Sequence, residues 1–209
     1  MDLPSFPSHT PRPTEKDLLR KLSRGDGFCS KAAGLNRAKL APFCTNMVPN
    51  HKPKFEPQPA STCPWKFYLN RGDISESFSH PVIIGAVEGG SERLRNFMIT
   101  AKQVEQDGSL GRIVGHWEYQ WDTIPICCYE PGKDYSHEGR QLHPNLLIGR
   151  QANPRGLNQT LIWTAPHHFE GSVVIVATFW KTSRLYWPYI ESVPIIITRK
   201  SHHPNFSQG

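Results

Sequence analysis

The sequence lacks any apolar run long enough to cross a membrane as a helix. A transmembrane helix needs about 18 to 20 consecutive apolar residues, whereas the longest apolar stretch among the 209 residues, Val173 to Trp180, has the length of one β-strand. The first 21 residues, MDLPSFPSHTPRPTEKDLLRK, also lack the apolar core of a secretory signal. We therefore expect no membrane span in this chain.

Motifs for catalysis, metal binding and nucleic-acid recognition are missing as well. The sequence has no Gly-x-Ser-x-Gly elbow, phosphate-binding glycine loop, dinucleotide fingerprint, zinc-finger spacing or RNA-binding aromatic motif. His137 and His143 are six residues apart, whereas a zinc-protease helix places its two histidines four apart, and Gly139 and Pro144 disfavour a helix here. The pattern predicts a non-enzymatic protein without metal, cofactor or nucleic-acid partner.

The composition favours short strands joined by turns. The chain contains 19 Pro and 16 Gly, and aromatic residues reach 11%. We predict an all-β fold built as an antiparallel β-sandwich. Four segments are expected: a disordered leader (1–28), an irregular Cys-, Pro- and Lys-rich arm (29–64) held by disulfides rather than by burial, the sandwich domain (44–199) and a flexible tail (200–209).

Strand-like runs recur from Trp65 onward, bounded by turn residues. Gly115–Asp122 alternates aromatic with polar residues, which predicts a strand with one aromatic face, and Val173–Trp180 predicts a central strand covered on both faces. The last run is expected to break at Pro188 or Pro194. The predicted strands are Trp65–Leu69, Phe78–Val87, Leu94–Val104, Ile113–Trp121, Thr123–Tyr129, Leu146–Ile148, Thr160–Thr164, Val173–Lys181 and Leu185–Thr198.

Two of the five cysteines, Cys127 and Cys128, are adjacent in the sequence. Neighbouring residues on a strand point to opposite faces, so the two cannot both enter the core or easily bond to each other. Each therefore needs its own partner or stays reduced.

Several short motifs resemble those of one known family. Cys44 to His51, CTNMVPNH, fits a Cys followed by Met-x-Pro-x-His, and Trp163-Thr164-Ala165-Pro166 fits a second family motif. Further matches are Gly171-x-Val173, Ala177-Thr178, and Trp187 with Ser192. On these residues the sequence resembles the reelin-type, or reeler, domain of secreted and cell-surface animal proteins, over residues 44–198.

The resemblance implies an immunoglobulin-like β-sandwich in an extracellular protein, although no signal peptide is present. It also implies that Cys44 pairs with Cys127 or Cys128. Gly27-Phe28-Cys29-Ser30 is similar to the start of spondin-like reeler domains. If this similarity holds, Cys29 could pair with whichever of Cys127 and Cys128 is not bonded to Cys44. Cys63 would then be unpaired or available for an intermolecular bond. Family members include matrix and guidance proteins, arthropod defence proteins and the outer domain of membrane ferric reductases, but no haem-binding helices follow here.

Positive charge suggests a class of partner. The formal net charge is +6, which attracts polyanions. We expect a non-enzymatic extracellular binding module that engages a matrix polyanion, such as a sulfated glycosaminoglycan, or another cell-surface component. The alternatives are a secreted innate-defence protein that recognises a microbial surface polymer, and an intracellular scaffold with reduced thiols. The candidate polyanion-binding residues are Lys31, Arg37, Lys39, Lys52, Lys54 and Lys66.

Two other kinds of motif point to the cell exterior. Arg24-Gly25-Asp26 and Arg71-Gly72-Asp73 carry the integrin-binding tripeptide, although Gly-Asp is also favoured in hairpin turns. Asn158 and Asn205 begin Asn-x-Ser/Thr sequons, which are candidate N-glycosylation sites.

Overall fold

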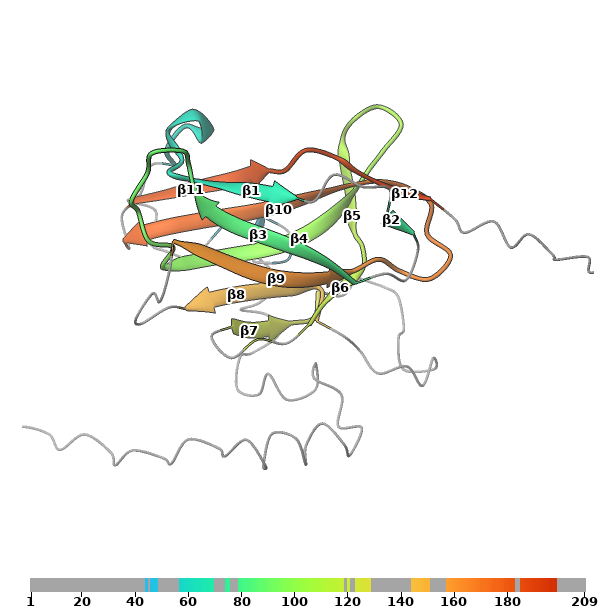
Figure 1. Cartoon of the computed structure of the whole chain (residues 1–209). Helices are drawn as coiled ribbons and strands as arrows, with labels where there is room; N and C mark the ends of the chain where they lie inside the picture. Colours follow the sequence, from blue (N-terminus) through green and yellow to red (C-terminus); the bar gives the residue numbers. More distant parts are fainter. Residues whose placement is uncertain are drawn as a thin grey trace, which may run out of the picture.

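The computed structural model describes residues 44, 46–48, 57–69, 74–75, 79–118, 120, 123–128, 144–150, 157–182 and 185–198. In these residues the chain forms two β-sheets stacked as a sandwich (Figure 1). The elements are the 3-10 turn η1 (Ala60–Thr62) and the strands β1 (Trp65–Leu69), β2 (Ile74–Ser75), β3 (Ser79–Ala86), β4 (Asn96–Val104), β5 (Leu110–Ile113), β6 (His116–Trp117), β7 (Thr123–Ile126), β8 (Leu146–Arg150), β9 (Asn158–Thr164), β10 (Gly171–Thr182), β11 (Leu185–Glu191) and β12 (Ile195–Thr198).

The smaller sheet has four strands in the order β1-β3-β9-β6. The larger sheet follows the order β2-β12-β10-β4-β8-β7, with β11 paired to β10 and β5 paired to β4. The described pairs of these strands are antiparallel except β12 with β2, which is parallel. The predicted all-β sandwich is confirmed.

The main core lies between the two sheets and is rich in aromatic side chains. Trp65 packs edge-on against Trp187 with ring centroids 5.6 Å apart, and Trp163 is fully buried. The Trp65 indole N–H donates to Glu92 O at 3.2 Å, and that of Trp163 donates to Val114 O at 3.2 Å. These two donors are satisfied, whereas the indole nitrogen of the buried Trp117 has no hydrogen-bond partner among the described residues.

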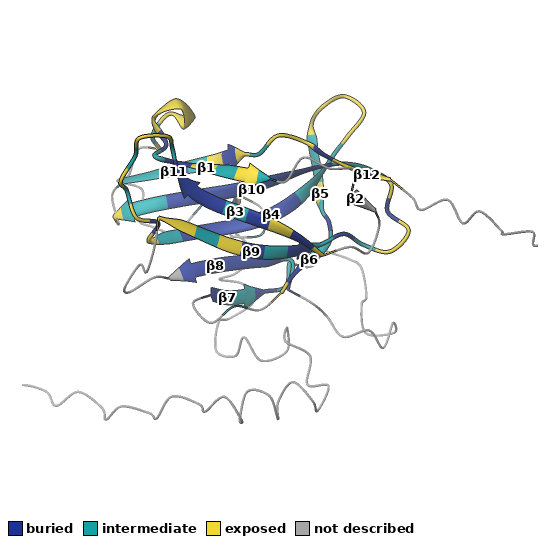
Figure 2. Ribbon diagram, in the orientation of Figure 1, coloured by how far each residue is buried: buried dark blue, intermediate teal, exposed yellow. Residues whose placement is uncertain are grey.

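Strand β10 occupies the centre of the larger sheet, as its apolar run predicts. All seven residues from Val173 to Phe179 are buried (Figure 2). Odd-numbered residues of this run face the main core, and the even-numbered Val174 and Val176 belong to a second apolar cluster on the other side of the sheet. The strand is therefore covered on both faces.

The second cluster corrects the expectation that the arm is held by disulfides rather than by burial. Met47, from the arm, is completely buried and packs in the cluster with Met98, Ile148, Val176 and other side chains of the larger sheet. These partners come from strands about 50 to 130 residues later in the sequence. Local sequence pattern carries no sign of such a distant contact.

The predicted strand Ile113–Trp121 is wrong. The chain leaves β5 in the larger sheet and enters β6 in the smaller one, so this segment crosses between the layers. The crossing occurs at Gly115, whose φ of 69° is in the left-handed region, and a Cβ there would lie 2.6 Å from the Trp163 indole nitrogen. Only glycine combines that backbone conformation with so close an approach. Trp121, one of the predicted aromatic-face residues, lies outside the described residues.

The remaining strand predictions agree with the structure to within three residues at each described boundary. β1 has the predicted bounds, and the final run divides at Ser192–Pro194 rather than at Pro188, which lies inside β11. The short β2 and the turn η1 were not predicted, because two or three residues carry no periodic signal. The leader 1–28 and the tail 200–209 lie outside the described residues.

Candidate functional site

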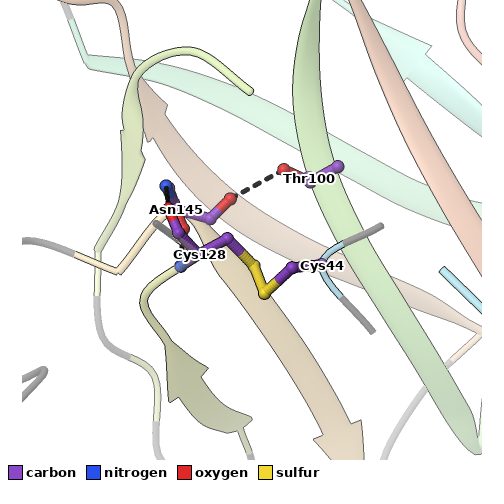
Figure 3. The surroundings of a disulfide bond; sticks show 4 residues. All are labelled: Cys44, Thr100, Cys128 and Asn145. Atoms are coloured by element: carbon purple, nitrogen blue, oxygen red, sulfur yellow. Dashed lines mark hydrogen bonds between the residues drawn. A yellow bond between two sulfur atoms is a disulfide. The ribbon is translucent and has the colours of Figure 1, made fainter. Parts of the chain in front are cut away.

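A disulfide fastens the N-terminal arm to the outer face of the larger sheet. Cys44 is bonded to Cys128, 84 residues later, with Cα atoms 5.4 Å apart (Figure 3). Both cysteines pack against the second apolar cluster. Of the two partners left open for Cys44, the structure has Cys128. Cys127 is disulfide-bonded too, and its predicted partner, Cys29, lies outside the described residues.

Asn145 holds Cys128 in place through two side-chain hydrogen bonds. Its amide nitrogen donates to Cys128 O at 2.9 Å, and its amide oxygen accepts from Cys128 N at 2.7 Å. The Thr100 hydroxyl on β4 donates to the Asn145 carbonyl at 2.7 Å (Figure 3). Asn145 therefore prolongs the β7–β8 pairing with a side chain, which fixes Cys128 relative to the sheet.

Met47 supplies the second attachment of the arm. Its side chain is buried in the second cluster, and its carbonyl accepts a hydrogen bond from the Thr178 hydroxyl of β10 at 2.5 Å. Thr178 is itself fully buried, so this bond satisfies a polar group that β10 carries into an apolar environment. Residues 44–48 are thus anchored at both a disulfide and a buried side chain. We call them the anchor segment.

The positive charge of the protein lies outside the described sandwich. The described residues contain seven Lys or Arg and seven Asp or Glu, so the formal net charge of +6 falls entirely in the rest of the sequence. The arm, residues 29–64, contributes five Lys or Arg against one Glu. In the sequence, Lys39 and Lys52 are the nearest of these residues on either side of the anchor segment.

Lys66 does not belong with the arm. It lies in β1 and is exposed on the outer face of the smaller sheet, whereas the anchor segment covers the outer face of the larger sheet. The sandwich separates the two. The other five candidate polyanion-binding residues, Lys31, Arg37, Lys39, Lys52 and Lys54, lie outside the described residues, as do both Arg-Gly-Asp triplets and Asn205.

The structure brings Lys66 together with the other described candidate, Asn158. Lys66 is paired with Gly85 of β3, and Gly85 with Asn158 of β9, so the three residues form one row across the smaller sheet. The Lys66 ammonium lies 4.9 Å from the centroid of the Tyr68 ring. Tyr68 was not singled out from the sequence, since one tyrosine in a strand gives no signal of its surroundings.

Burial changes the acidity of one cysteine inside the sandwich. Cys63 is a buried free thiol, and desolvation raises its pKa to about 11, so the nucleophilic thiolate is scarce at neutral pH. Of the two alternatives for Cys63, the structure has the unpaired thiol, and its burial disfavours an intermolecular bond. Among the described residues, no three His, Cys, Asp or Glu side chains gather as metal ligands. No helix in the described part is long and apolar enough to span a membrane.

Comparison with known proteins identifies related sequences. A family model described as the Reeler domain matches residues 42–203. "Putative defense protein 1" of Antheraea mylitta is 27% identical over 166 residues, covering 77% of this chain and 84% of that protein. "Putative defense protein Hdd11-like" of Samia ricini is 26% identical and covers 73% of this chain and 81% of its own length. "Putative defense protein" of Bombyx mori is also 26% identical and covers 74% of this chain and 80% of its own length.

Solved structures were also found. The human F-spondin reeler domain (fragment 1) superimposes with a TM-score of 0.45 at 12% identity, over 70% of this chain and 96% of that one. The Reelin-N domain of F-spondin gives a TM-score of 0.42 at 14% identity, over 65% of this chain and 87% of that one.

Proposed function

The chain belongs to the Reeler domain family, and from that premise we propose that it acts outside the cell as a binding module without catalytic activity of its own. The observation that supports this most directly is the match over residues 42–203, together with relatives named as defence proteins of which this chain covers at least four fifths. A disulfide fastening the arm to the sandwich suits an oxidising, extracellular environment.

The ligand we propose is an anionic polymer. An electrically balanced sandwich carries a basic arm, and the arm is anchored to one outer face at residues 44–48. In the sequence, lysines occur on either side of the anchor segment. Long-range attraction of this kind concentrates charged ligands at the surface without requiring a deep pocket.

Two sources of such a polymer remain distinct candidates. Microbial surface polymers are favoured by the names of the relatives, which are defence proteins. Matrix polyanions such as sulfated glycosaminoglycans are favoured by the basic arm alone. The same charges would serve both, so binding experiments must offer both ligands side by side.

The test measures binding of the full chain to immobilised heparin, purified bacterial cell-wall polymers and neutral dextran. We expect binding to at least one anionic polymer, no binding to dextran, and a loss of affinity for Lys52→Glu/Lys54→Glu. Lys66→Glu is a control for position, because it reverses a single charge on the opposite outer face. Binding of cell-wall polymers but not heparin would assign the defence function, and the reverse would assign the matrix. No binding to any anionic polymer would refute the proposed ligand class.

A further inference from the structure

The outer face of the smaller sheet holds a close arrangement around Gly85. An added Cβ at Gly85 would overlap Asn158 Oδ1 and would lie 2.8 Å from Tyr68 Cε2 and 3.1 Å from Asn158 Cγ. Both side chains therefore lean over this glycine from the neighbouring strands. The Tyr68 hydroxyl donates to Ala86 O at 2.6 Å, which holds the ring in place along the sheet.

In the folded sheet the Asn158 amide lies over Gly85 with its oxygen nearest to the glycine. The nitrogen on the same carbon lies farther from that glycine. Asn158 and Thr160 are both exposed on β9, and residues two apart on a strand share a face. The asparagine and the hydroxyl of the sequon thus face solvent together.

The outer face of the smaller sheet also exposes apolar side chains. Tyr68 is 39% exposed, Pro81 is exposed, and Ile83 and Ile162 are half-buried on the same side of the sheet. A pyranose has one face of C–H groups, which packs well against an aromatic ring whose face carries partial negative charge. Asn158 on β9 and Tyr68 on β1 flank β3, so a sugar attached at Asn158 reaches this ring across one intervening strand.

We propose that Asn158 carries an N-linked glycan whose first sugar lies over Gly85 against Tyr68 and Lys66. The glycan covers the outer face of the smaller sheet and leaves the opposite face, with the anchored arm, for ligands. The inference rests on the extracellular location in the proposed function, because the modification is made on exported chains.

The attachment is a group transfer from an oligosaccharide carried on a lipid diphosphate. The Asn158 amide nitrogen forms a bond to C1 of the first sugar and gives up a proton, while the bond from C1 to the diphosphate oxygen breaks and the lipid diphosphate leaves. No oxidant or reductant is needed. Since Asn158 pairs with Gly85 in the folded sheet, the transfer takes place before β9 joins β3.

The first experiment is glycopeptide mass spectrometry on the chain recovered from its native source, with the same chain secreted from an animal cell line behind a signal peptide. We expect a glycan at Asn158 in both. Thr160→Ala should abolish it, and Thr160→Ser should keep it, because serine preserves the sequon. A secreted native protein with a bare Asn158 would overturn the inference and leave the proposed function standing. Retention inside the cell with reduced cysteines would overturn both.

The second experiment asks whether the sugar rests on the ring. A peptide-N-glycosidase, which hydrolyses the amide bond between the asparagine and the first sugar, should release the glycan from the native protein more slowly than from the denatured one. Tyr68→Ala should speed native release roughly three- to tenfold, as the ordinary strength of a ring contact allows. Tyr68→Phe keeps the ring and should behave like the wild type. Equal release from all three native proteins would refute the contact, and a thermal unfolding curve for each confirms that the variants are folded.

Discussion

His80 is a buried histidine in β3 of the smaller sheet. It lies on β3 facing Trp163 of β9 and is 7% exposed, and its Nε2 has no hydrogen-bond partner among the described residues. Burial lowers the pKa of this imidazole from its ordinary value, because the charged form loses its hydration. The neutral ring is thus the form that the folded protein accommodates.

Acidification should therefore destabilise the protein through His80. Because the pKa is lower in the folded state, the unfolded chain takes up the proton first, and the free energy of unfolding falls as the pH drops below about 6.5. His80→Phe removes this contribution. Urea unfolding at pH 7.5 and pH 5.5 should show a larger loss for the wild type than for His80→Phe. An equal loss in both would mean that the imidazole is solvated when the protein is folded.

Gly149 on β8 shows how tightly the main core is filled. It pairs with Phe97 of β4, and an added Cβ would lie 2.6 Å from Phe97 Cδ1. We expect Gly149→Ala to lower the free energy of unfolding by roughly 1–3 kcal/mol, the usual effect of overpacking. In a double-mutant cycle with Phe97→Leu the two losses should be less than additive, because the smaller side chain makes room for the methyl group. Additive losses would contradict the overlap.

At the scale of elements, the anchor segment determines how the arm joins the sandwich. Replacing Cys44 and Cys128 together by alanine should lower the free energy of unfolding by roughly 4–5 kcal/mol in the chain-entropy model, given the long loop that the disulfide closes. The comparison is by denaturant unfolding under oxidising conditions. A loss near zero would mean that burial and hydrogen bonds already hold the arm without the bond.

Met47→Ala separates burial from the disulfide. The side chain is completely buried, so we expect a loss of about 2–5 kcal/mol even with the disulfide intact. Val193→Ala is the control, since this side chain is 54% exposed and should change stability by less than about 0.5 kcal/mol. If both variants unfolded like the wild type, the arm would be tied by its disulfide alone, as the sequence pattern suggested.

The elements that could be predicted from sequence are those whose contacts leave a local pattern. The apolar run of β10 and the alternation in β1 and β3 reflect burial of faces within the strand itself. The crossing at Gly115 and the burial of Met47 depend on Trp163 and Thr178, which are far along the chain. The arrangement of the candidate residues is limited in the same way. Residue types singled out Lys66 and Asn158, whose roles stay predictions, but their common row and the neighbouring ring of Tyr68 follow from strand register.

For the whole molecule, the separation of a neutral sandwich from its basic flanks predicts how binding responds to salt. The described residues balance seven positive against seven negative side chains, so attraction to a polyanion must come from the remaining sequence. Attraction between charges in solution is screened over about 10 Å at 0.1 M salt. Each ion pair with a polyanion also releases condensed counterions, which makes the affinity fall steeply as salt rises.

Affinity for the bound polymer should therefore drop by an order of magnitude or more between about 0.05 and 0.2 M NaCl. Lys52→Glu/Lys54→Glu should lower both the affinity and the slope of its logarithm against the logarithm of salt concentration. Arg93→Glu/Arg95→Glu, on exposed positions of the sandwich, is the matched control and should change neither by much. Titrations at four salt concentrations give all three slopes. Binding that persists at very high salt would contradict recognition by the charged arm, as would an equal effect of the two double reversals. Either result would indicate that the polymer binds to the surface of the sandwich.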